Sequence, residues 1–327
     1  MASDAAPLSS REGGAEPVGD AGAADPAKNI VWLASYPKSG NTWFRVFLTN
    51  LLGGRQETAD INDLDDTRIA SARGAFDNAV GLEAGDLTGD EIDLLRPRVY
   101  DRWSASSPDE ILFRKIHDAY EYTSGGEPLI SVTATRAALY LVRNPLDVAV
   151  SYAHHSRSSL DDAVSALCDP DHAFCGNPGV LANQLRQRIS TWSGHVRSWT
   201  RQRDIPVRVV RYEDMKRRPI ETFADAVSFA GFDYDIPAIA RAVELSAFER
   251  LREQEAADGF REKARNAGWF FRRGEVGAWR DALSSEQVSR IVACHGEVMA
   301  ELGYATDGRP EEVCAAPLSG RPRPDPS

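Results

Sequence analysis

The segment VWLASYPKSGNTWFRVFLTNLL, residues 31–52, decides the fold. An apolar run ends at the turn YPKSG, and a pattern typical of a helix begins directly after it. Pro37 and Gly40 favour a turn at this point. The free N–H groups at the start of a helix, with Lys38 beside them, form a site for an anion. The segment therefore predicts a strand, a phosphate-binding turn and a helix.

The spacing of this turn differs from that of a nucleotidase P-loop. The pattern GxxxxGK[ST] is absent, because the lysine precedes the glycine. A P-loop enzyme also needs an acidic magnesium ligand at the end of a second strand, and here the strand predicted to end at Val142 is followed by Arg143. The turn alone leaves two interpretations open: a specific anion site, or a lysine-containing turn that only caps a helix.

Apolar runs alternate with helix-like segments along the rest of the chain. The pattern predicts strands at 30–34, 111–113, 137–142 and 207–210, and helices at 41–52, 146–154 and 186–201. Such an alternation predicts one α/β domain, with a central, mostly parallel sheet flanked by helices. Ligands of these sheets bind beyond the carboxyl ends of the strands, and the polar motifs of this chain fall there.

Composition limits the possible partners and the domain boundaries. The net charge of −11 argues against nucleic acid and anionic membranes as partners. Histidine and cysteine do not occur with zinc-ligand spacing, and neither a signal peptide nor a run of about 20 apolar residues is present, so we expect a cytoplasmic protein. Residues 1–28 lack aromatic side chains and are rich in alanine and glycine, which predicts a disordered tail. We expect the folded domain at 29–306 and a flexible tail at 307–327.

Four motifs resemble those of the cytosolic-type sulfotransferases, which use 3'-phosphoadenosine 5'-phosphosulfate (PAPS). YPKSGNTW (36–43) resembles the family's YPKSGTTW loop, and LVRNPLDVAVSYAHH (141–155) resembles its RNPxDVxVSxxH segment. RYEDM (211–215) and FFRRGEVGAWRDAL (270–283) resemble its YEDM stretch and its RKGxxGxW signature. The resemblance implies a P-loop-nucleotidase-like sulfotransferase fold. It also implies transfer of a sulfuryl group from PAPS to a hydroxyl of a small-molecule acceptor, without a metal.

The resemblance also implies which residues bind PAPS. The 5'-phosphosulfate is expected at the helix start, the 3'-phosphate at arginines, a serine and a glycine, and the adenine between aromatic rings. The set is Lys38, Ser39, Gly40, Asn41, Thr42, Trp43, Arg143, Ser151, Tyr212, Ser246, Phe248, Arg272, Arg273 and Gly274. Asn41 stands where the family's animal members usually have threonine, and we expect its amide to cap the helix. The alternative roles are core packing for Phe248 and a solvated surface pair for Arg272 and Arg273.

A histidine is expected to act as general base. In ILFRKIHDAYEY (111–122), Lys115 and His117 are two positions apart, so on an extended chain both reach one side of the strand end. The segment resembles the family's KTH, whose histidine abstracts the acceptor's proton, and a pKa near neutrality suits that task. Lys38 and Lys115 are expected to stabilise the charge that develops on the transferring group. His154 and His155 are alternative bases or contacts of the acceptor.

Two other functions and several details stay open at this point. A small-molecule kinase would need a metal-binding acid near the turn, and Asp147 is the nearest candidate. A nucleotide-binding protein without activity would share the fold. The acceptor is undefined; residues 55–110 and 156–185 are the segments expected to shape its pocket, and the second could form a lid. The oligomeric state is open, because Ser284-Ser285 stand where the family's dimerisation pattern has Thr-Val.

Overall fold

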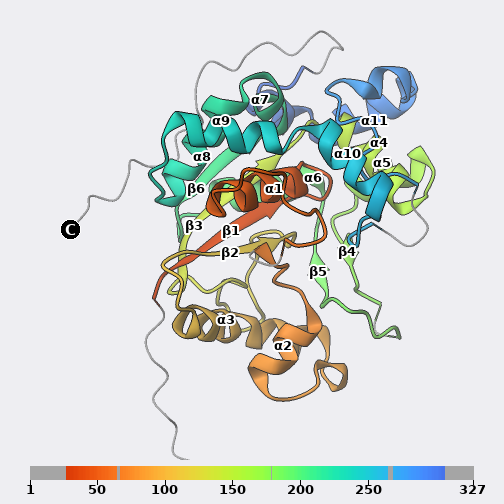
Figure 1. Cartoon of the computed structure of the whole chain (residues 1–327). Coiled ribbons are helices and arrows are strands. Elements are labelled where there is room, and N and C mark those ends of the chain that lie inside the picture. The colour runs from red at the N-terminus through yellow and green to blue at the C-terminus, as the bar shows by residue number, and fades with distance from the viewer. Residues whose placement is uncertain (1–26, 65–66, 178, 264–267, 306–327) are drawn as a thin grey trace, which may run out of the picture.

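A four-stranded, fully parallel sheet forms the centre of the fold (Figure 1). The computed structural model describes residues 27–305, except 65–66, 178 and 264–267. The strand order is β2-β1-β3-β6, and β4 and β5 form a separate antiparallel pair. The strands are β1 (Ile30–Ser35), β2 (Leu112–Ile116), β3 (Thr135–Val142), β4 (Ala173–Phe174), β5 (Gln187–Arg188) and β6 (Val207–Arg211).

Helices occupy most of the chain between and after the strands. They are α1 (Asn41–Leu52), α2 (Arg73–Val80), α3 (Gly89–Ser106), α4 (Pro145–Ser156), α5 (Leu160–Leu167), α6 (Trp192–Arg201), α7 (Tyr212–Arg217), α8 (Pro219–Ala230), α9 (Ile236–Leu245), α10 (Phe248–Asp258) and α11 (Ser285–Glu301), with the short 3-10 helices η2 (Ala84–Asp86) and η3 (Ala278–Asp281).

The central strand β1 is buried on both faces. Val31 and Leu33 belong to the apolar cluster formed with α1, α8 and α9, whereas Trp32 belongs to the cluster that includes Tyr100 of α3. Alternate residues of a strand point to opposite faces, so one apolar run supplies both layers of the core. Figure 1 shows the two layers, with α1, α8 and α9 on one side of the sheet and α3 on the other. The predicted α/β fold is confirmed.

Most predicted elements are found within two or three residues of their expected bounds, but the helix predicted at 186–201 begins only at Trp192. Gln187 and Arg188 instead pair with Phe174 and Ala173 as an antiparallel ladder. The side chain of Thr191 accepts a hydrogen bond from the N–H of Gly194 and so caps the helix. The start of the prediction was wrong because this short ladder, formed with residues 173–174, takes the place of the first helical turns.

Each strand of the main sheet ends at a predicted site residue. The anion turn follows β1, His117 follows β2, Arg143 follows β3 and Tyr212 follows β6. Because the strands are parallel, these four ends lie at one edge of the sheet. The fold therefore brings together motifs that are up to about 180 residues apart in the sequence.

The two predicted tails, 1–28 and 307–327, lie outside the described residues apart from residues 27 and 28, so the domain boundaries stay predictions. Among the helices of the described part, none has the length and apolar character needed to cross a membrane. The predicted pocket segments are partly helical, since 55–110 contains α2 and α3 and 156–185 contains α5.

Candidate active site

A cavity of about 500 Å³ opens at the carboxyl edge of the sheet, a size typical of small-molecule sites. Twelve of the predicted cofactor-binding residues and both further catalytic candidates line it. They are Lys38, Gly40, Asn41, Thr42, Trp43, Arg143, Ser151, Tyr212, Phe248, Arg272, Arg273 and Gly274, with Lys115 and His117. Ser39 and Ser246 are fully buried and lie behind this lining. The sequence thus predicted 14 of the 30 residues that line the cavity.

The anion turn has the backbone shape that its sequence favours. Lys38 and Gly40 have φ angles of 71° and 94°, and a β-carbon on Gly40 would lie 2.7 Å from the ring of Tyr212. The position therefore requires glycine. Gly40, the residue at the N-cap of α1, has no side chain that could cap the helix, so the first N–H groups of α1 are available to an anion. The hydroxyl of Ser39 is also buried and has no hydrogen-bond partner among the described residues.

Lys38 lies in the cavity with its Nζ 4.2 Å from the centre of the Phe270 ring. Burial, together with the positive charges of Lys115 and Arg143, lowers its pKa to about 7. Near neutral pH, about half of the Lys38 side chains are therefore uncharged until an anion arrives. A bound anion would stabilise the charged form of Lys38.

Lys115 and Arg45 share one carboxylate. Glu262 accepts from the Lys115 Nζ at 3.0 Å and from the Arg45 Nη1 at 2.6 Å. Burial alone would raise the pKa of Glu262, but the two cations hold it at about 2, so the group is ionised at neutral pH. Burial lowers the pKa of Lys115, and Glu262 opposes that effect. The carboxylate favours the charged form of Lys115 and fixes its Nζ within the cavity.

Within the described part of the chain, the ring of His117 is hydrogen-bonded through one nitrogen, Nδ1. Its Nδ1 lies 2.9 Å from the carbonyl oxygen of Ser35 and 3.1 Å from the Ser35 hydroxyl. Burial and the positive charge of Lys115 lower the pKa of His117 well below its usual value, so the ring is neutral at pH 7. A neutral imidazole that donates through Nδ1 has a lone pair on Nε2. The ring lines the cavity and can accept a proton there.

The end of β3 and the RRG segment form a second basic wall. The Arg143 guanidinium lies 4.3 Å from the centre of the Tyr212 ring and donates to the Glu275 carbonyl at 2.7 Å, while its Nε has no partner among the described residues. Tyr212 donates to the Gly274 carbonyl at 2.9 Å. Gly274 has a φ of 62°, and a β-carbon there would lie 2.6 Å from Phe248. This close approach needs glycine and brings the backbone to the cavity.

Trp43 and Phe248 provide aromatic surfaces. The Trp43 ring is edge-on to Tyr212 at 5.8 Å, and its Nε1 donates to the Ser246 carbonyl at 2.9 Å. The Ser246 hydroxyl donates to a helix carbonyl and accepts from Asn50. The Ser246 side chain is thus bonded within the wall, and its carbonyl orients Trp43; its place near the edge of the adenine stays a prediction.

The comparisons with known proteins agree with this geometry. A family model described as "Sulfotransferase domain" matches residues 132–303, which is more than half of the chain. The chain belongs to the sulfotransferase family. "Cytosolic sulfotransferase 1" of Arabidopsis thaliana is 25% identical over 288 residues, 81% of this chain and 77% of the relative. "Flavonol 3-sulfotransferase" of Flaveria bidentis is 23% identical over 275 residues, 80% and 79% of the two chains.

Solved structures support the same fold. Retinol dehydratase, solved with androsterone and the inactive cofactor PAP, aligns with a TM-score of 0.52 at 21% identity over 83% of this chain and 80% of that chain. Mouse sulfotransferase SULT7A1, solved with PAP, aligns with a TM-score of 0.50 at 20% identity over 84% and 85% of the two chains. The predictions of the family, of the fold and of a PAPS-dependent sulfotransferase are confirmed.

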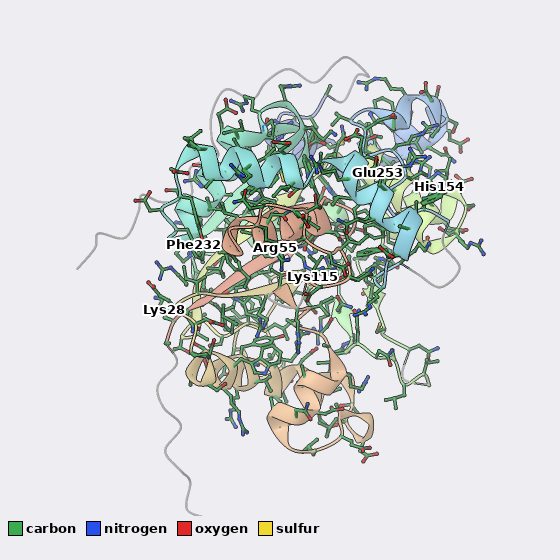
Figure 2. The ribbon with its side chains drawn as sticks, viewed as in Figure 1. Lys28, Arg55, Lys115, His154, Phe232 and Glu253 are labelled. Carbon is green, nitrogen blue, oxygen red and sulfur yellow. The ribbon has the colours of Figure 1, made fainter. Side chains whose placement is uncertain are left out.

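The two adjacent histidines of this sulfotransferase differ in position. His155 lines the cavity beside Phe270, with ring centres 6.2 Å apart. Burial, followed by Lys38 and Lys115, lowers the pKa of His155 to about 4, so the ring is neutral at pH 7. His154 is exposed, and Figure 2 shows it at the periphery of the molecule, far from the central Lys115. Of the pair, His155 is the one placed to meet an acceptor.

The kinase alternative depends on Asp147, and the carboxylate of this residue is hydrogen-bonded to backbone N–H groups. Its two carboxylate oxygens accept from the N–H groups of Gly277 and Trp279 at 2.7 and 3.1 Å. The carboxylate thus joins α4 to the segment after Arg272-Arg273-Gly274. In the described part of the chain, no three acidic, histidine or cysteine side chains group in a way that could hold a metal ion. Asp147 is a structural residue that positions the basic wall.

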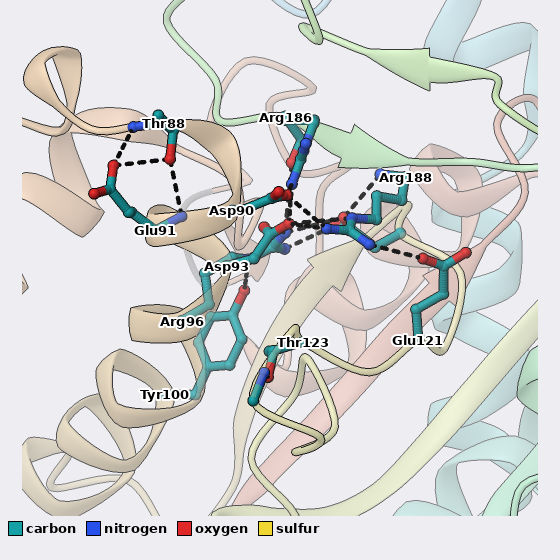
Figure 3. Close-up of polar contacts among 12 residues, drawn as sticks. Thr88, Asp90, Glu91, Asp93, Arg96, Tyr100, Glu121, Thr123, Arg186 and Arg188 are labelled. Carbon is teal, nitrogen blue, oxygen red and sulfur yellow. Dashed lines mark hydrogen bonds and ion pairs between the residues drawn. The ribbon is translucent and has the colours of Figure 1, made fainter.

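A buried cluster of charges joins α3 to β5 behind His117 (Figure 3). Arg96 and Asp118 are both fully buried and make two parallel contacts of 3.0 and 2.7 Å. Asp118 also accepts from the backbone N–H of Arg188 at 3.0 Å. Asp118 follows His117 directly, so the cluster fixes the end of β2 relative to the wall formed by β5. The sequence did not predict it, because its members come from three separate segments: α3, the residues after β2, and β5 with Arg186.

Several residues of the cavity were not predicted from the sequence. Phe270 lies in the quoted FFRRG motif and could have been found there. Ile69, Phe174 and Gln184 come from the segments 55–110 and 156–185, which were expected to shape the acceptor pocket without any single residue being named. Gln187, Arg261 and Glu262 lie in segments that match no motif.

Proposed function

We propose that this sulfotransferase transfers the sulfuryl group of PAPS to a hydroxyl of a small-molecule acceptor, with His117 as general base. The observation that carries the proposal is the common cavity: the anion turn, the basic wall, Lys115 and His117 all line it. PAPS, when bound, supplies the sulfuryl group and leaves as adenosine 3',5'-bisphosphate. The chain's own residues bind, orient and move one proton.

The residues of the cavity fit a nucleotide that carries phosphates at both ends. The buried Ser39 hydroxyl and the Arg143 Nε have no partners among the described residues, which suits a ligand rich in acceptor oxygens. Gly40 and Gly274 leave space where any other residue would place a β-carbon. We assign the 5'-phosphosulfate to the anion turn with Ser39 and Thr42. We assign the 3'-phosphate to a set comprising Arg143, Ser151, Arg272, Arg273 and Gly274.

Three side chains have chemical roles in the proposal. Lys38 places positive charge beside the anion turn, where it stabilises the charge that grows on the leaving oxygen. Lys115 does the same for the transferred oxygens, and Glu262 keeps it in place. His117 accepts the acceptor's proton at Nε2, the nitrogen that Ser35 leaves available.

The acceptor half of the cavity favours a compact molecule with an apolar body. Ile69, Phe174 and Phe270 line the same cavity as His117 and His155. One relative carries the name flavonol 3-sulfotransferase, and a flavonol combines an aromatic body with a hydroxyl. We propose a phenol or an apolar alcohol rather than a polysaccharide. Relatives named cytosolic support the cytoplasm as the proposed location.

Acceptor-dependent release of adenosine 3',5'-bisphosphate from PAPS tests this function. We expect turnover with members of a panel of phenols and apolar alcohols, and little with oligosaccharides. The sulfated product is identified by its mass, with the His117→Ala protein as the control for uncatalysed transfer. Turnover confined to oligosaccharides would overturn the acceptor class, and transfer of phosphate from ATP with magnesium would overturn the reaction.

Binding of the nucleotide is expected to weaken as pH rises from 7 to 9. In the free protein the pKa of Lys38 is about 7, and a bound anion raises it. Binding above pH 7 therefore takes up a proton, and the affinity falls by up to about tenfold per pH unit through this group. Lys115 contributes in the same direction. Calorimetry with adenosine 3',5'-bisphosphate in buffers of different ionisation enthalpy measures the uptake.

The Lys38→Arg protein is the control for this linkage. Arginine stays charged throughout this range, so we expect most of the proton uptake to disappear while binding persists. A wild-type affinity that is constant between pH 7 and 9 would contradict the lowered pKa of Lys38.

A further inference from the structure

Asn41 does not have the role that its place at the helix start predicts. No side-chain bond caps α1. The Asn41 Nδ2 instead donates backwards, to the Leu33 carbonyl at 2.9 Å and to the Ser35 hydroxyl at 3.1 Å. Both acceptors belong to β1, and Asn41 is 5% exposed. The side chain therefore joins the first residue of α1 to the last residues of the central strand.

Ser35 passes this connection on to His117. One ring nitrogen, Nδ1, faces two acceptors of the same residue, the carbonyl oxygen at 2.9 Å and the hydroxyl oxygen at 3.1 Å. A carbonyl oxygen only accepts, so Nδ1 carries the proton and Nε2 does not. The bond from Asn41 holds the Ser35 hydroxyl in the rotamer that faces the ring. A chain of hydrogen bonds thus runs from Asn41 through Ser35 to His117.

We propose that Asn41 and Ser35 are positioning residues that hold His117 in the Nδ1-protonated tautomer, with Nε2 facing the cavity. The proposal rests on the proposed function, in which Nε2 is the base. It assigns a purpose to the asparagine that stands where the resemblance leads one to expect threonine. A single hydroxyl at residue 41 could not donate to Leu33 and Ser35 at the same time.

A second contact fixes the main chain of the same residue. His195 is fully buried on α6. Its Nδ1 lies 2.8 Å from the Tyr140 hydroxyl, and its Nε2 lies 3.0 Å from the His117 carbonyl oxygen. Because that carbonyl only accepts, the His195 Nε2 carries a proton and its Nδ1 accepts from Tyr140. The backbone of His117 is thereby anchored, and the remaining freedom is rotation of its ring, which Ser35 restricts.

The arrangement also joins the base to the anion turn. Asn41 follows Ser39 and Gly40 directly, and its own backbone belongs to the first turn of α1. A ligand that orders this turn would therefore order the Asn41 side chain and, through Ser35, the ring of His117. We expect binding of adenosine 3',5'-bisphosphate to narrow the ring signals of His117.

Nitrogen-15 NMR of the histidine rings tests the proposal without turnover. The His117 signals are those missing from the His117→Ala spectrum. In the wild-type protein at pH 7 we expect a protonated Nδ1 and an unprotonated Nε2. In the Asn41→Leu and Ser35→Ala proteins the His117 ring keeps only some of the hydrogen bonds that hold it, and we expect a mixture of its two neutral tautomers. If the Asn41→Leu protein does not fold, the Asn41→Thr protein is used in its place, because threonine keeps one polar group at residue 41.

Kinetics give the second readout. A misplaced base is expected to lower kcat by about 10- to 100-fold in Asn41→Leu, with a smaller change in the Kd of adenosine 3',5'-bisphosphate. Asn29→Leu is the matched control. Asn29 is a buried asparagine directly before β1, and its amide donates to the carbonyls of Ser104 and Asp109 at the opposite end of the strand. We expect this control to change stability without changing the tautomer of His117.

The outcomes separate the two proposals. Unchanged His117 signals in the variants at residues 35 and 41 would overturn the positioning role, even if His117→Ala is inactive. A tautomer mixture in those variants, combined with full activity of His117→Ala, would support positioning of the ring but overturn the base. An Nε2-protonated ring in the wild-type protein would overturn the positioning role directly.

Discussion

Replacing His117 by alanine is expected to lower kcat by about 10²- to 10⁴-fold, the contribution of a positioned general base. The reason is the neutral ring in the cavity, which donates through Nδ1 and has its lone pair on Nε2. Binding of adenosine 3',5'-bisphosphate should change little, because the proposed phosphate contacts lie elsewhere in the cavity. Steady-state kinetics with a sulfatable phenol, combined with calorimetry of the nucleotide, measures both quantities.

His155→Ala is the comparison that this experiment needs, because His155 lines the same cavity. The pKa of His155 is lowered to about 4 and that of His117 also lies well below its usual value. The two rings are therefore distinguished by the bond from Nδ1 of His117 to Ser35 and not by their basicity. We expect the variant to raise KM for the acceptor more than it lowers kcat. Full activity of His117→Ala, together with inactivation by His155→Ala, would move the base to His155.

Removing Arg96 is expected to destabilise the protein by about 3–5 kcal/mol, the typical cost of leaving one buried charge without its partner. Arg96→Leu would leave the fully buried Asp118 without its ion-pair partner, with only its contact to the Arg188 backbone N–H among the contacts described above. The paired variant Arg96→Leu/Asp118→Leu removes both charges and should recover part of the loss. Denaturant unfolding of the three proteins measures the free energies of unfolding.

An exposed ion pair provides the control for this prediction. Arg290 and Asp161 lie 3.3 Å apart, with side chains that are 42% and 68% exposed. Because solvent screens such pairs, Arg290→Ala should change stability by about 1 kcal/mol or less. If Arg96→Leu costs no more than Arg290→Ala, the buried pair does not hold α3 against the end of β2.

The sequence predicted the arrangement of the sheet and about half of the cavity lining because both depend on local patterns. An apolar run followed by a turn or a helix start marks the end of each parallel strand, and parallel strands bring those ends to one edge. The proximity of Lys38, His117, Arg143 and Tyr212 therefore follows from the pattern of strands in the sequence. The RRG segment was placed by resemblance, since it follows no strand of the sheet.

The missing parts depend on contacts between distant segments. Glu262 reaches Lys115 from a position 147 residues away, and no local pattern marks it. The ladder of β4 and β5 likewise replaced the predicted start of α6. Asn41 shows a third case: its residue type and position favour a cap, but acceptors on β1 lie within reach of its amide once α1 packs against the sheet. Tertiary contacts decided all three.

Calorimetric titration of the purified protein with adenosine 3',5'-bisphosphate, beside ADP and ATP with magnesium, tests the central claim most directly. Each charge-assisted hydrogen bond to the 3'-phosphate contributes about 1.5–3 kcal/mol, so we predict that the 3',5'-bisphosphate binds at least about tenfold more tightly than ADP. The preference should shrink in Arg143→Ala. Equal binding of ADP, or tighter binding of ATP with magnesium, would contradict the account of the cavity as a PAPS site.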